Sequence, residues 1–146
     1  MILFNRYKNT QVKLVDVETF EINSTMCDSF HEITLILLVN IEEATIKYAE
    51  VQFLRQPDQI CKETSKLAGT LIGLRLDKGI KKTANENIGG SAGCTHLVDL
   101  VLEAAKAFIQ GRFRKHFEDV GDSEQAREDL GKKLEGTCWF HSRNSR

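Results

Sequence analysis

The sequence has no long apolar run and no marked excess of charge of either sign. Its 146 residues carry 20 Lys and Arg against 21 Asp and Glu, a formal net charge of −1. No run of about 18 apolar residues is present, so the sequence predicts no membrane-spanning helix. The N-terminal residues Met1–Arg6 become polar too early for the apolar core of a secretory signal peptide. We therefore expect a cytoplasmic protein that does not bind membranes.

Proline and cysteine are also scarce, with one proline and four cysteines in the chain. The single proline and the ten glycines exclude a collagen-like or low-complexity chain. In a cytoplasmic protein the four thiols are expected to be free or metal-bound rather than joined in disulfides. The length fits one domain with a packed core, which we place at residues 1–136, followed by a C-terminal tail at 137–146.

The first half of the chain is rich in β-branched and alternating apolar residues. This pattern predicts three strands, at Thr10–Ile22, His31–Asn40 and Ala44–Leu54, with a polar turn at Asn23–Ser29. Because the connections are short, the strands are expected to form an antiparallel meander; parallel pairing would need long crossovers.

From Pro57 onward the apolar residues recur at helical spacing. The pattern predicts a helix after Pro57, a short helix at Ile80–Ile88, an amphipathic helix from Thr95 to Gln110 or beyond, and a polar helix at Ser123–Leu134. Strands followed by helices predict an α+β fold, a three-stranded meander with helices packed on one face.

A glycine-rich stretch leads directly into Cys94, Thr95 and His96, at the start of the clearest helix. The N–H groups and partial positive charge of a helix N-terminus stabilise a thiolate, so Cys94 is a candidate nucleophile or metal ligand. Thr95 is expected to cap this helix. A small anion could bind there, at Gly93 and Thr95.

Thiol and imidazole side chains are also ligands of zinc and iron. The sequence offers two short Cys/His pairs, Cys94-x-His96 and Cys138-x-x-His141, and no Cys-x-x-Cys motif. We expect Zn, Fe or an iron–sulfur species to be held by Cys61, Cys94, His96 and Cys138, with His31 and His141 as secondary candidates.

Two other motifs favour ordinary structural roles. Gly89–Gly93 matches Gly-x-Ser-x-Gly, but a hydrolase nucleophile elbow needs a preceding apolar strand and a larger sheet. Arg112–Phe117 interleaves basic and aromatic residues, yet acidic residues follow it directly, which favours a solvated helix face. With a pI near 6.4, we expect no nucleic-acid partner.

One set of residues, in this order, resembles a known family, bacterial "domain of unknown function number 2889". The set comprises Arg6, His31, Pro57, Cys61, Leu71-x-Gly73, Gly89-Gly90-x-x-Gly93-Cys94-Thr95-His96-Leu97 and Cys138. The resemblance implies a small cytosolic bacterial domain without an established activity. Where the family usually has His directly after the late cysteine, this sequence has Trp139, and His141 follows it.

A weaker, architectural likeness is to iron–sulfur scaffold proteins of the NifU type. A meander, then a cysteine, then a Leu-x-Gly helix and a further cysteine at a helix start are similar to those scaffolds. Cys61 and Cys94 would be the matching positions, and the likeness implies that thiolates converge at one end of the sheet. The scaffolds' Gly-Cys-Gly and His-Cys signatures are absent.

Three functions therefore stay open, and the sequence favours the first. A metal-binding protein would use the Cys/His set. A thiol enzyme would use Cys94 as nucleophile, with His96 or His31 as base. A non-catalytic module would bind an unknown protein or small-molecule partner and use its cysteines for packing. A working cysteine is expected to be partly exposed with His or a cation close by, whereas apolar groups enclose a structural one.

Overall fold

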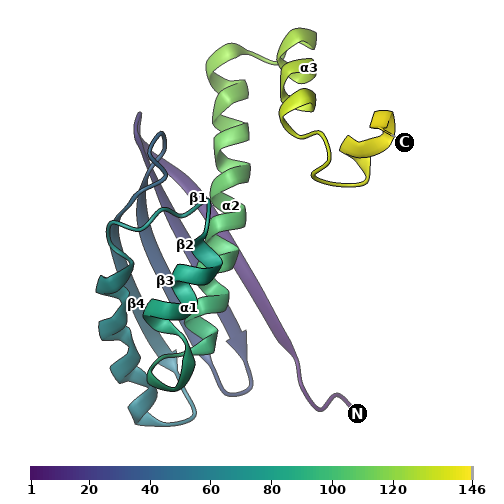
Figure 1. Cartoon of the computed structure of the whole chain (residues 1–146). Helices are drawn as coiled ribbons and strands as arrows, with labels where there is room; N and C mark the ends of the chain where they lie inside the picture. The colour runs from purple at the N-terminus through teal and green to yellow at the C-terminus, as the bar shows by residue number, and fades with distance from the viewer. Residues whose placement is uncertain (146) are drawn as a thin grey trace. The chain divides into compact units, whose positions relative to one another are not determined.

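The computed structural model describes residues 1–145, which fall into two compact units. The first unit is Met1–Ile109 and the second begins at Gln110. The first holds the whole sheet and the helices that pack on it (Figure 1). Since the predicted site residues of both the glycine-rich stretch and the strands lie in the first unit, this unit positions the candidate site. The domain boundary predicted at residue 136 stays a prediction.

Four antiparallel strands form the sheet, in chain order: β1 (Arg6–Asp16), β2 (Thr19–Asp28), β3 (Glu32–Asn40) and β4 (Ile46–Arg55). The α+β class and the meander are confirmed. The predicted number of three strands is wrong, because the segment Thr10–Ile22 is not one strand. It contains the end of β1, a tight turn and the start of β2.

The turn between β1 and β2 contains no glycine or proline to mark it. Asp16 makes the turn itself, because its Oδ1 accepts the N–H of Glu18 at 2.8 Å. Such a side-chain-to-backbone bond reverses the chain locally without any break in the apolar pattern. Val15 and Val17 on either side therefore gave the appearance of a continuous strand.

The polar segment Asn23–Ser29 is not a turn for most of its length, since β2 continues to Asp28. Its hydroxyl groups are matched across the sheet. Ser24 bonds the hydroxyl of Thr10 on β1, and Thr25 bonds that of Thr34 on β3, each at 2.9 Å. These cross-strand pairs let polar residues occupy a central strand without losing hydrogen bonds.

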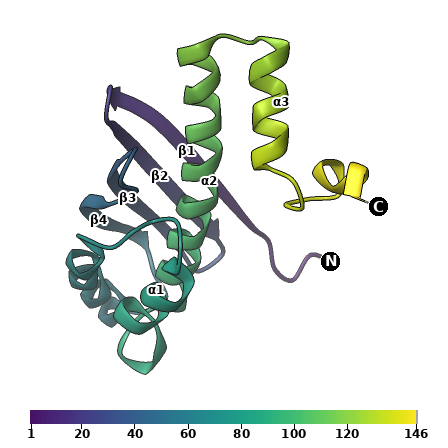
Figure 2. The ribbon, with the colours of Figure 1, turned by 45° about the horizontal axis from the view of Figure 1, so that its top comes forward.

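One face of the sheet is covered by helices and the other is not (Figure 2). Alternate residues of the central strands are buried on the covered face, as the two-residue period of a strand requires. Those of β2 and β3 are Phe20, Ile22, Ser24, Met26, Asp28, Ile33, Leu35, Leu37 and Val39.

The helices of the first unit are η1 (Gln59–Leu71), α1 (Ile80–Ile88), η2 (Gly90–Ala92) and the first part of α2 (Thr95–Val120). η1 is a 3₁₀-helix, and the bounds predicted for α1 and for the start of α2 are confirmed. The predicted apolar stripe of α2 is buried against the sheet: Leu97, Leu100, Val101, Ala104, Ala105 and Phe108. Val98 is buried with it. This packing fixes the N-terminal end of α2 over the sheet.

The second unit contains the rest of α2, then α3 (Glu124–Lys133) and the 3₁₀-helix η3 (Phe140–Ser145). Ser123 caps α3, because its hydroxyl accepts the N–H of Ala126 at 3.1 Å. Across residues 1–145, no helix combines the length and the apolar character needed to span a membrane.

Candidate functional site

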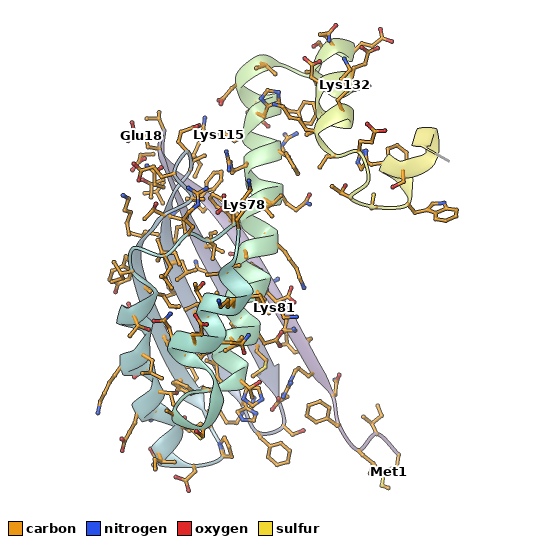
Figure 3. The ribbon with its side chains drawn as sticks, in the orientation of Figure 1. Met1, Glu18, Lys78, Lys81, Lys115 and Lys132 are labelled. Atoms are coloured by element: carbon orange, nitrogen blue, oxygen red, sulfur yellow. The ribbon has the colours of Figure 1, made fainter. Side chains whose placement is uncertain are left out.

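Three distant segments meet at one end of the sheet. β1 begins at Arg6, which pairs with Asp28 at the end of β2. The β1–β2 turn, with Glu18, lies at the opposite end of the hairpin (Figure 3). The third segment is the start of α2, whose His96 contacts Arg6. The site therefore lies where the first strand begins, the second ends and α2 begins.

Asp28 is the buried centre of this site, and its side chain is 0% exposed. Its Oδ2 accepts the Nε–H of Arg6 at 2.8 Å, and its Oδ1 accepts the backbone N–H groups of Phe30 and His31 at 2.7 Å each. Burial by itself raises the pKa of the Asp28 carboxyl, but the bonds from Phe30, Arg6 and His31 outweigh it. The net effect holds the pKa of Asp28 well below its usual range, so the carboxylate is ionised.

The ionised Asp28 also determines which nitrogen of His31 carries the proton. His31 Nδ1 lies 3.1 Å from Asp28 Oδ1, and a carboxylate can only accept. In neutral His31 the hydrogen therefore sits on Nδ1, and Nε2 keeps its lone pair. This carboxylate–imidazole arrangement orients a general base.

His96 has the same tautomer for a different reason. Arg6 Nη2 lies 3.3 Å from His96 Nε2, and because a guanidinium can only donate, Nε2 is the acceptor. The hydrogen of neutral His96 then sits on Nδ1, which lies 4.0 Å from Cys94 Sγ. His96 therefore presents a donor to the sulfur. The His31 ring, whose centroid is 4.2 Å from that of His96, carries an acceptor at Nε2.

The surroundings keep His96 neutral. Burial, together with the electrostatic effects of His31 and Arg6, lowers the pKa of His96 below its ordinary value of 6.5, against the opposing effect of Asp28 and Asp99. A protonated His96 would also place an N–H against the Arg6 guanidinium.

The lowered pKa of His96 predicts how stability depends on pH. The unfolded chain takes up the proton near pH 6.5 and the folded chain only at lower pH, so the stabilising contribution is complete above pH 6.5 and declines as the pH falls below it. We expect the free energy of unfolding to fall from pH 7 toward pH 5, and to fall less in His96→Gln. Urea unfolding at each pH measures this.

His116→Gln, which changes a histidine on α2 outside the site, is the matched control and should keep the wild-type slope. The contribution of Asp28 does not confuse the result, because its ordinary pKa is 3.8 and its loss falls in a more acidic range. An unchanged slope in His96→Gln would contradict the prediction.

Cys94, not Thr95, is the N-cap of α2, so the predicted cap is wrong by one residue. The Cys94 carbonyl accepts the N–H of Val98 at 3.2 Å, the first bond of the helix, and Thr95 is the first helical residue. The Cys94 N–H donates to the Ile88 carbonyl at 2.7 Å. Cys94 is half-buried and packs against the edge of the core. It is partly exposed and lies beside a histidine.

The anion site predicted at Gly93 and Thr95 would lie at the same helix start. The N–H of Gly93 is already used, because it donates to the Gly90 carbonyl at 3.3 Å. Within residues 1–145, no protein acceptor takes the backbone N–H groups of Thr95 and His96. These two groups, one and two residues after Cys94, are the donors open to a ligand.

Three other predicted ligands lie on separate segments of the chain. Cys61 is in η1 of the first unit, whereas Cys138 and His141 belong to the second unit. Over residues 1–145, no group of three or more His, Cys, Asp or Glu side chains is arranged to hold a metal ion. Metal binding by the Cys/His set stays a prediction. The remaining cysteine, Cys27 on β2, lies 3.3 Å from Arg55 Nη2.

Sequence reasoning missed Asp28 entirely and gave Arg6 no role. The signal for Asp28 was its place at a strand end, three residues before His31. An aspartate in that position often accepts the backbone N–H groups of the turn that follows, as Asp28 does from Phe30 and His31. No local pattern could have found the role of Arg6, because its partners are 22 and 90 residues away in the chain.

The fold and site together define an α+β protein with a Cys–His pair at a helix start, backed by an Arg–Asp–His group. The model of the family described as a protein of unknown function, DUF2889, matches residues 8–110. Because this is more than half of the 146 residues, the chain belongs to that family, and the resemblance is confirmed. No curated protein and no solved structure matches the chain. The likeness to NifU-type scaffolds finds no support in these comparisons.

Proposed function

We propose that this protein is a thiol enzyme that transfers an acyl group through Cys94. The observation that carries the proposal is the geometry of two adjacent histidine rings: His96 Nδ1 lies 4.0 Å from the Cys94 sulfur, and His31 Nδ1 lies 3.1 Å from Asp28. It assigns one ring a donor toward the sulfur and the neighbouring ring a free lone pair. A thiol site needs both, because the sulfur must lose a proton and the sulfur anion must then be stabilised.

The residues present have distinct roles in such a reaction. His31 Nε2, oriented by Asp28, accepts the Cys94 proton as the sulfur adds to the carbonyl carbon of a substrate. The free N–H groups of Thr95 and His96 stabilise the oxyanion that forms. The bond to the leaving group then breaks, the leaving group takes the proton from His31, and the acyl group remains as a Cys94 thioester.

Water or another nucleophile completes the reaction by the same steps in reverse order. It loses its proton to His31 as it attacks the thioester, and the Cys94 sulfur takes that proton when it leaves. Arg6 acts through its neighbours: it neutralises Asp28 and holds the His96 ring so that Nδ1–H points toward the sulfur. Arg6 and Asp28 are therefore positioning residues in this scheme.

Alkylation kinetics test the proposal. With iodoacetamide near pH 6.5, we expect Cys94 to react about tenfold or more faster than Cys61, because Cys94 stands at the start of α2 and His96 Nδ1 lies 4.0 Å from its sulfur. Both cysteines are half-buried and belong to the same unit, so Cys61 is an internal control. Mass spectrometry of the cysteine-containing peptides gives both rates in one sample.

Removing the donor to the sulfur should remove the difference. In His96→Phe the ring remains but its N–H is lost, and the Cys94 rate is expected to approach that of Cys61. Equal rates in the unmodified protein would favour a non-catalytic module. Metal content of the same protein, purified without chelator, tests the alternative of zinc or iron on the Cys/His set.

A further inference from the structure

Two exposed aromatic side chains lie beside members of the Arg–Asp–His group that backs Cys94. Phe30, 59% exposed, lies in the β2–β3 connection between Asp28 and His31, and its ring lies edge-on to the His31 ring with centroids 6.5 Å apart. Phe4, 51% exposed, precedes β1, and its ring centroid is 5.1 Å from the Arg6 guanidinium carbon. The two rings thus meet two charged or titratable members of one site.

Folding does not account for a phenyl group at position 30. The hairpin uses only the backbone of Phe30, whose N–H bonds Asp28 at 2.7 Å, and any residue except proline supplies that group. A phenyl ring left in water gives up the stabilisation that burial provides. Single exposed apolar residues are common on proteins, but two aromatic rings on one polar cluster are typical of the wall of a ligand site.

The cations of the site are paired with acidic side chains. Arg6 and Asp28 form an ion pair at 2.7 Å, and His96 is held neutral. Beside them, Lys8 on β1 is paired with Asp99 and Glu103 at 2.8 and 3.3 Å. No cation here is free of an acidic partner, so the site offers an apolar surface and two N–H groups rather than a charged pocket for a polyanion.

We propose that the acyl group taken by Cys94 is aromatic, with its ring packed against Phe30 and Phe4. This inference rests on the proposed function and names its substrate class. Phe30 is then a specificity-determining residue: it binds the ring next to the carbonyl that Cys94 attacks. Aromatic rings packed edge-to-face or offset gain attraction beyond the area they bury, which favours an aromatic over an aliphatic group.

A pair of alkylating probes tests the inference on the full chain. Chloroacetamide and N-phenylchloroacetamide both transfer an acetamide group: the thiolate forms the C–S bond and chloride leaves. For each cysteine we divide the rate with N-phenylchloroacetamide by the rate with chloroacetamide. This ratio is expected to be about tenfold larger at Cys94 than at Cys61, because burying an apolar group accelerates the reaction by a factor of that order. Because both probes react with the same thiolate, the ratio does not depend on the fraction of each cysteine that is ionised.

In Phe30→Ala the ratio at Cys94 should fall to that at Cys61, while Phe30→Leu should retain part of it. Tyr48→Ala removes a similarly exposed aromatic residue from β4 and should leave the ratio unchanged. Thermal unfolding of each variant checks that it is folded, and the rate with chloroacetamide shows that the thiol itself is intact.

The possible outcomes separate this inference from the proposed function. A fast Cys94 whose ratio matches that of Cys61, or whose raised ratio survives in Phe30→Ala, overturns the aromatic specificity and leaves the thiol enzyme standing. A Cys94 no faster than Cys61 with either probe overturns both. A raised ratio lost only in the Phe30 variants supports the inference.

Discussion

Adding one methyl group at Gly93 is expected to disrupt both the fold and the site. A Cβ built there would lie 2.1 Å from the Ile88 carbonyl oxygen, 2.4 Å from its carbon and 2.6 Å from the Gly89 oxygen. All three are backbone atoms, so no side chain can turn away. We expect Gly93→Ala to lower the free energy of unfolding by about 3 kcal/mol, the upper part of the range for overpacked sites.

Urea unfolding followed by circular dichroism measures the change. Gly69→Ala in η1 is the matched control, because no atom lies within 4 Å of a Cβ at that position, and it should cost little. The same clash displaces the Ile88 carbonyl that binds the N–H of Cys94, so rapid alkylation of Cys94 should be lost too. A Gly93→Ala protein as stable as Gly69→Ala would contradict the packing described here.

Removing the charge of Asp28 is expected to cost a similar amount. In Asp28→Asn the amide can still accept the N–H groups of Phe30 and His31, but its own NH₂ then faces the Arg6 guanidinium, donor against donor. Breaking a buried ion pair by changing one partner leaves the other charge uncompensated, and a loss of about 3 kcal/mol is expected at pH 7.

The pH dependence identifies the cause. The folded-state pKa of Asp28 is lowered from an ordinary value of 3.8, so its stabilisation is present above that pH and is lost as the pH falls below it. The difference between wild type and Asp28→Asn should therefore shrink in acid. Asp16→Asn is the control, because Asp16 makes a similar turn bond and Asn can replace it. A difference that persists unchanged in acid would assign the loss to packing instead.

The helices, and the position of Cys94 at the start of α2, could be predicted from the sequence because their signals are local. The apolar stripe of α2 repeats over three turns, and the glycines before Cys94 end the preceding helix, so both signals are local. The β1–β2 turn was missed because Asp16 makes it with a side-chain bond. Strand periodicity alone does not reveal such a turn.

The membership of the site could be predicted only in part. Cys94 and His96 are two residues apart at a helix start, where spacing is informative, and the structure places them together. Cys61 and Cys138 were joined to them by residue type alone, and spacing along the chain does not say where the fold places them. Asp28 was overlooked because an aspartate at a strand end usually serves a turn. Its further partner, Arg6, is 22 residues away in the chain, on the neighbouring strand β1.

The separation of the site residues along the chain has a consequence for how the protein folds. Arg6 and His96 are 90 residues apart, so their contact closes a long loop, and loop closure of this length follows local structure formation in time. The β2–β3 hairpin can bring Asp28 and His31 together early, but His96 reaches Arg6 and the His31 ring only when α2 docks. In refolding experiments, rapid alkylation of Cys94 should therefore be among the last native properties to return.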